Sequence, residues 1–133
     1  VFRLRIPFDQ YASPRNYLTK LLSYDTLLDS ENSLSHRADF AKYVMELINQ
    51  EVPHGIYNVT NKGSVTTKDV VELIKKHNLS NKDFKFFDDL ESFGKETIAP
   101  RSNCVLDTTK IEQYIKTRTA IEALEEALSK YKQ

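Results

Sequence analysis

Short runs of β-branched and aromatic residues alternate with longer amphipathic runs along the chain. Phe2, Leu4 and Ile6 alternate with two arginines and Pro7 ends the run, so residues 1–6 are predicted to form a strand. Further short strands are predicted over residues 26–28, 55–60 and 84–87. Because the first strand starts at the first residue, we expect the chain to be a fragment of a longer protein, with the rest of a sheet upstream.

Between these strands, apolar residues recur at helical spacing and predict helices. Ser13-Pro14 is expected to open the first helix, which continues to about Ser23, because Ser can cap free N–H groups and Pro loses nothing at the first helical position. Thr66 and Thr119 are expected to cap two later helices. Helices after the first are predicted over residues 36–49, 66–77, 89–97, 107–115 and 119–131. Polar loops are predicted at 29–35 and 99–103.

The order of these elements favours an α/β fold with parallel strands over an all-helical bundle. No internal repeat or low-complexity linker divides the chain. Residues 1–133 are therefore predicted to form a single domain.

Composition narrows the class of protein without naming a function. Hydrophobic residues make up 40% of the 133 residues, which excludes a disordered tail. Nineteen Lys and Arg balance nineteen Asp and Glu, so the basic excess typical of a nucleic-acid-binding domain is missing. No apolar run is long enough for a membrane span, no signal peptide begins the chain, and a single cysteine fits a reducing compartment. We expect a soluble, cytoplasmic domain.

The sequence lacks the residue patterns of dinucleotide binding, of Tyr-x-x-x-Lys catalysis and of metal binding. The three glycines do not have the spacing of a dinucleotide-binding turn, and no Tyr is followed four residues later by Lys. The histidines are far apart in sequence, so no metal site is expected. We interpret His36, His54 and His77 as surface or packing residues, and Cys104 as a buried structural thiol.

Two segments are candidates for binding an anionic ligand. The first surrounds Arg15 and Asn16, where a guanidinium, an amide and free helix N–H groups predict a phosphate site; the alternative is a capped surface helix. In the second, Pro100 stiffens a loop that presents Arg101 for bidentate bonds to a diphosphate. The alternative there is an ordinary surface salt bridge of Arg101.

Four motifs give the chain a family resemblance. It resembles the C-terminal part of extended short-chain dehydrogenases/reductases that act on nucleotide sugars. Within that group it is most similar to the plant-type UDP-4-keto-6-deoxy-glucose 3,5-epimerase/4-reductases of rhamnose synthesis, which are related to the dTDP-4-dehydrorhamnose reductases. The motifs are Leu4-Arg5-Ile6-Pro7-Phe8-Asp9, residues 13–21, Gly55-Ile56-Tyr57-Asn58-Val59-Thr60-Asn61, and Ala99-Pro100-Arg101-Ser102-Asn103 followed by Leu106-Asp107-x-x-Lys110.

The resemblance implies a division of labour. NADP(H) or NAD(H) and the catalytic Tyr-x-x-x-Lys would belong to a Rossmann half that is missing here, so this chain alone is expected to contain no catalytic residue and to be inactive. The present part would bind the nucleotide sugar, UDP- or dTDP-linked, through Arg15, Asn16, Arg101 and Asn103. The longer protein would then make UDP- or dTDP-L-rhamnose.

One alternative stays open from the sequence. Regulatory subunits of methionine adenosyltransferase resemble the same reductases, carry a similar Pro-Arg loop and use the fold to bind a partner enzyme. The resemblance does not settle oligomeric state, and a homodimeric parent is one alternative. No nucleic acid or membrane partner is expected.

Overall fold

The structure is a computed structural model that describes residues 1–86 and 104–131. Its helices are α1 (Tyr17–Ser23), α2 (Arg37–Asn49), α3 (Thr67–Lys76), α5 (Thr109–Glu112) and α6 (Ala120–Ser129). Its strands are β1 (Phe2–Arg3), β2 (Pro7–Phe8), β3 (Thr26–Leu27), β4 (Glu31–Asn32), β5 (Ser35–His36), β6 (Tyr57–Asn58), β7 (Val65–Thr66) and β8 (Lys85–Phe86). None of the helices in the described ranges is long and apolar enough to cross a membrane.

The strands pair two by two across long stretches of sequence. Pairs β1–β6, β2–β5 and β3–β8 are parallel, whereas β4–β7 is antiparallel. The predicted α/β class with parallel strands is confirmed, with one antiparallel pair added.

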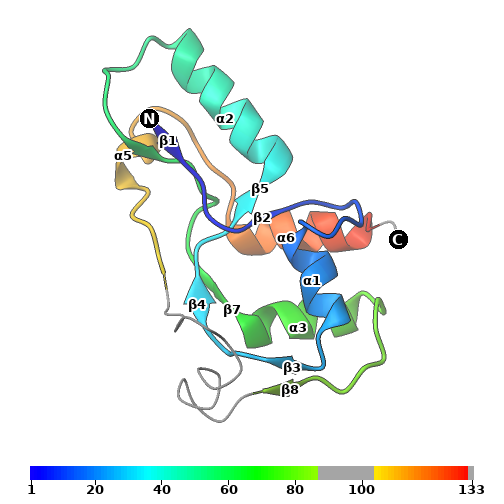
Figure 1. Cartoon of the computed structure of the whole chain (residues 1–133). Coiled ribbons are helices and arrows are strands. Elements are labelled where there is room, and N and C mark those ends of the chain that lie inside the picture. The colour runs from blue at the N-terminus through cyan, green and yellow to red at the C-terminus, as the bar shows by residue number, and fades with distance from the viewer. Residues whose placement is uncertain (87–103, 132–133) are drawn as a thin grey trace.

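Two hydrophobic cores occupy the two ends of the molecule in Figure 1. One lies among α1, α3 and α6, and its fully buried side chains include Leu18, Val70, Ile74 and Leu124. The other packs α2 and α5 against β6. The pair β2–β5 lies between the two ends (Figure 1), so both halves meet at His36, where β5 passes into α2.

Local capping signals predicted several helix starts correctly. Thr66 and Asp69 form a reciprocal capping box at the start of α3. The Thr119 hydroxyl accepts the N–H of Glu122 at the start of α6. The predicted second helix is confirmed as α2, and His36 is its cap.

The N-terminal predictions need correction. The strand over residues 1–6 is only β1, because Ile6 has φ 44° and breaks the extended backbone. Pro7 begins β2 rather than ending a strand, a position where its missing N–H costs nothing. The first helix starts at Tyr17, three residues beyond Pro14. The loop predicted over 29–35 contains β4 and the start of β5.

Other differences lie in the second half. The 55–60 strand is confined to β6, and β7 was not predicted. Helix α5 ends before Tyr114, and its N-cap residue is Thr108; the Asp107 carboxylate accepts the N–H of Thr109. Ile121, in the first turn of α6, is exposed. The helix predicted over 89–97 and the loop over 99–103 lie outside the described residues.

Candidate functional site

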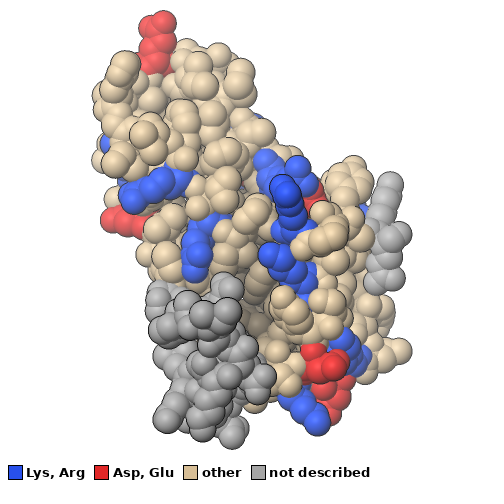
Figure 2. Space-filling model, viewed as in Figure 1, with Lys and Arg blue, Asp and Glu red and all other residues tan. Residues whose placement is uncertain are grey.

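A cavity of about 580 Å³ opens between α1, the start of α3 and the segments around β2 and β4. This volume is in the range of small-molecule binding pockets. Three cationic side chains line it, Arg5, Arg15 and Lys20, and no carboxylate does among the described residues. Figure 2 shows Lys and Arg side chains on both sides of the hollow in the middle of one face. The cavity is therefore suited to an anionic ligand.

Arg5 is held in place from two sides. Its Nη2 donates to Asn32 Oδ1 at 2.9 Å, and its backbone N–H donates to the Ser35 hydroxyl at 3.1 Å. Asn32 is itself fixed, because its Nδ2 donates to the Ser30 hydroxyl at 3.0 Å. The Arg5 Nε is buried and has no hydrogen-bond partner. The guanidinium thus enters the cavity with a fixed orientation and an unused donor.

The backbone beside Arg5 is strained. Ile6 has φ 44°, in the left-handed region that a β-branched residue rarely adopts. Such a conformation costs on the order of 1–3 kcal/mol, and these outliers cluster at ligand sites. The kink separates β1 from β2 and directs both Arg5 and Pro7 to the cavity wall.

The structure separates the roles of Arg15 and Asn16. Asn16 is 3% exposed and caps α1, with Oδ1 accepting the N–H of Leu18 at 3.1 Å. Its Nδ2 donates to the backbone carbonyls of Asp9 at 2.8 Å and Tyr11 at 2.7 Å. The Asn16 amide is therefore fully engaged inside the chain. Arg15 is exposed and lines the cavity.

Tyr17 contributes a neutral phenol to the cavity wall. Burial raises its pKa to about 12, and a hydrogen bond with the Thr67 side chain lowers it in part. The phenol stays protonated at neutral pH, so it can pack against or donate to a ligand. It cannot accept a proton there as a general base.

Arg101 and Asn103 lie outside the described residues. The chain is described again at Cys104, which lines the same cavity. Two backbone hydrogen bonds fix Cys104 beside β4: its N–H donates to Glu31 at 3.1 Å, and its carbonyl accepts from Ser33 at 2.9 Å. The thiol residue is half-buried, which corrects the expectation of a buried structural cysteine.

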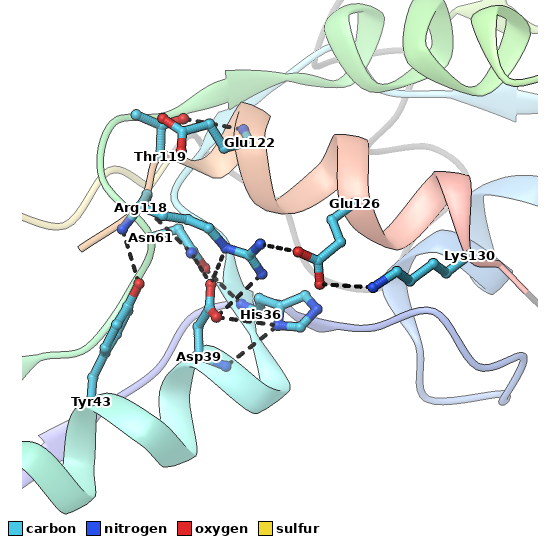
Figure 3. Close-up of polar contacts among 9 residues, drawn as sticks. All are labelled: His36, Asp39, Tyr43, Asn61, Arg118, Thr119, Glu122, Glu126 and Lys130. Carbon is cyan, nitrogen blue, oxygen red and sulfur yellow. Dashed lines mark hydrogen bonds and ion pairs between the residues drawn. The ribbon is translucent and has the colours of Figure 1, made fainter.

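A second polar cluster joins the two ends of the molecule. Arg118 lies between Asp39 of α2 and Glu126 of α6 (Figure 3). Its Nε donates to Asp39 Oδ2 at 2.7 Å, and its Nη1 donates to Glu126 Oε2 at 2.6 Å. Burial alone would lower the pKa of Arg118, but these hydrogen bonds outweigh it and raise the pKa. We call Asp39, Arg118 and Glu126 the clasp.

His36 lies beside the clasp (Figure 3). It is 3% exposed, and its Nδ1 accepts the N–H of Asp39 at the start of α2. Burial lowers its pKa, against the opposing charge of Asp39. The imidazole is thus held neutral and serves as a helix cap, in agreement with the interpretation of His36 as a packing residue. Opposite charges fill the clasp, so it offers no single-sign site for a ligand.

The described residues do not fit a dinucleotide or a metal. Gly55 and Gly63 lie on loops before β6 and β7, not on a turn from a strand into a helix. Within residues 1–86 and 104–131, no group of three His, Cys, Asp or Glu side chains could hold a metal ion. No chemical step through a cofactor can be built on these residues.

Comparison with known proteins gives the family context. No protein-family model matches the chain. The bifunctional dTDP-4-dehydrorhamnose 3,5-epimerase/dTDP-4-dehydrorhamnose reductase of Arabidopsis thaliana is 32% identical over 111 residues, 83% of this chain and 36% of that enzyme. The solved UDP-rhamnose synthase L780 of Acanthamoeba polyphaga mimivirus is 25% identical, with a TM-score of 0.87 over 97% of this chain and 45% of that one.

The chain is a homologue of part of these epimerase/reductases. Its fold also matches dTDP-4-dehydrorhamnose reductase from Bacillus anthracis, solved with NADP, with a TM-score of 0.73 at 16% identity over 98% of this chain and 46% of that one. Another structure of the same fold contains NAD+. The fold is therefore that of part of a short-chain dehydrogenase/reductase, as predicted. This epimerase/reductase homologue spans less than half the length of each of these relatives.

Proposed function

We propose that this chain is the nucleotide-sugar-binding domain of an epimerase/reductase that makes UDP- or dTDP-L-rhamnose. The single observation that supports this most is the cavity lined by Arg5, Arg15 and Lys20 without a carboxylate among the described residues. The diphosphate of a nucleotide sugar carries about two negative charges, which such a cavity can neutralise. The proposal extends to all 133 residues as one domain.

Each site residue has a distinct proposed part. Arg15 and Lys20 contact the diphosphate from the exposed rim of the cavity. Asn16 positions Arg15 by capping α1 and tying the 9–11 segment to it. Arg101 and Asn103, which precede Cys104 in the sequence, are proposed as further contacts to the nucleotide.

The chemical contribution of this domain is positioning. Holding the diphosphate fixes where the sugar ring lies, and such orientation can supply several kcal/mol of a catalysed reaction. The hydride and proton transfers of the relatives need residues that this sequence does not contain, such as Tyr-x-x-x-Lys. The chain alone is thus expected to bind the substrate and not to turn it over.

Calorimetric titration of the 133-residue chain with UDP and with dTDP tests the proposal. We expect micromolar to millimolar binding that Arg15→Gln weakens at least fivefold and that added salt weakens further. Arg3→Gln is the matched control, because Arg3 is an exposed arginine on β1 outside the cavity lining. If neither nucleotide binds, or if both substitutions have the same effect, the cavity is not the nucleotide site.

The regulatory-subunit alternative stays a prediction. It places the function on a protein partner, so a methionine adenosyltransferase would bind the chain with an affinity that Arg15→Gln does not change. The same variant therefore discriminates between the two functions.

A further inference from the structure

We infer that Arg5 is a ligand-binding residue that contacts the phosphoryl oxygens of the bound nucleotide, and that Asn32 is its positioning residue. The inference rests on the proposed function and deepens it, because the sequence motifs do not predict that Arg5 contacts the nucleotide. By its spacing in the sequence, Arg5 lies only on the polar side of a predicted strand.

The first argument is charge balance. Arg5 is half-buried, yet no described carboxylate forms an ion pair with it. Elsewhere in the described chain, the other partly buried arginine, Arg118, is paired with two carboxylates. Removing a cation from water without a counter-charge is costly, so an anion bound beside Arg5 offsets a cost that the protein already bears.

The second argument is hydrogen-bond balance. The Arg5 Nε is buried without a partner, although the large majority of buried side-chain polar atoms have one. Nη2 is already used on Asn32 Oδ1. An anionic oxygen that accepts from the Nε side would satisfy this donor and would form the charge-assisted bond that guanidinium groups make best.

The third argument is the choice of partner at position 32. Asn32 is 9% exposed, and its amide orients Arg5 without neutralising it. Aspartate has nearly the same shape and would bind the guanidinium more strongly. A neutral amide keeps the positive charge of Arg5 available to the cavity, whereas a purely structural arginine would be better held by a carboxylate.

Asn32→Asp in the full 133-residue chain tests this inference, with Asn81→Asp as the control. Asn81 is an exposed residue outside the cavity and undergoes the same change of charge. We expect Asn32→Asp to weaken UDP binding at least tenfold while the melting temperature of the free chain stays the same or rises. Asn81→Asp should change the affinity less than twofold.

Arg5→Gln with two simpler probes locates the contact. Inorganic pyrophosphate and UDP should both lose at least tenfold in affinity, and uridine should lose less than twofold. An equal loss for uridine would overturn the phosphoryl assignment. If the wild-type chain binds UDP and both Asn32→Asp and Arg5→Gln bind it equally well, the inference fails and the proposed function stands. If the wild-type chain binds no UDP, both fail.

Discussion

Replacing Arg118 by Ala removes the clasp without disturbing the backbone around it. The Arg118 carbonyl accepts from Lys62 at 3.0 Å, and its N–H donates to the Tyr43 hydroxyl at 2.9 Å, so main-chain bonds hold the segment. The guanidinium links Asp39 on α2 to Glu126 on α6 by direct hydrogen bonds. The substitution therefore isolates one connection between the two ends of the molecule.

The expected magnitude follows from exposure. The side chains of Arg118 and Asp39 are 25% and 14% exposed, whereas that of Glu126 is 44% exposed. A largely buried hydrogen bond between charged groups contributes about 1.5–3 kcal/mol, and an exposed pair about 0–1 kcal/mol. We expect a loss of roughly 3 kcal/mol, with the larger part from Asp39, which is left partly buried without its cation.

Thermal unfolding of the 133-residue chain measures this loss. At an unfolding entropy of about 2.1 cal/mol/K per residue, 3 kcal/mol corresponds to a fall of roughly 10 °C in Tm. Lys76→Ala is the control: Lys76 donates to Glu125 at 3.0 Å, but its side chain is 65% exposed and that of Glu125 is 34% exposed, so the loss should stay below about 1 kcal/mol. Arg118→Lys should be intermediate, because Lys cannot form the bidentate pair. A Tm for Arg118→Ala within about 2 °C of wild type would refute the reasoning.

Two further predictions concern caps. Asn16→Ala should cost roughly 2–3 kcal/mol in urea unfolding, more than an ordinary cap, because it also removes the Nδ2 hydrogen bonds to Asp9 and Tyr11. Asn16→Asp keeps the cap to Leu18 but turns a carboxylate oxygen, which cannot donate, toward the acceptors of Asp9 and Tyr11, so it should cost at least as much. His36 has a lowered pKa in the folded chain, so the unfolded chain takes up its proton first and stability should fall as the pH drops from about 7 to 5. In urea melts His36→Asn, which retains a capping oxygen, should flatten this slope; an unchanged slope would assign it to other groups.

The sequence predicted best the helix boundaries, which depend on residues within a few positions of one another. The boundaries of α2 and α3 followed from amphipathic spacing and from cap residues such as Thr66, whose partner is three residues away. The strands were harder, because a two-residue strand such as β7 exists only through its pairing with β4, more than thirty residues earlier. Asn16 rather than Ser13 caps α1 because its amide also binds Asp9 and Tyr11, which the sequence does not reveal.

The same limit applies to the site. The sequence singled out Arg15 because it lies beside a helix signal, and the structure places it on the cavity. It missed Lys20, which shares the wall of the cavity. Arg5 was missed too, because alternation with Phe2 and Leu4 is typical of the exposed face of a strand, and the Ile6 kink that turns the chain has no sequence signature. A guanidinium becomes a site candidate only when its neighbours are known.

The strained backbone at Ile6 makes two strand pairings possible and places Arg5 beside the cavity. An unbroken strand over residues 1–8 could pair with β6 or with β5 but not with both, because these two strands lie in different parts of the molecule. The left-handed residue lets β1 pair with β6 and β2 pair with β5, and Arg5 is left at the junction between them. Strain of about 1–3 kcal/mol thus gives the chain two strand pairings and one cation at a fixed point of the cavity. Substituting Ile6 by Gly should therefore relieve the backbone strain, because Gly adopts this φ freely. The loss of Ile6 packing against the core and the greater conformational entropy of the unfolded chain should oppose this gain in stability.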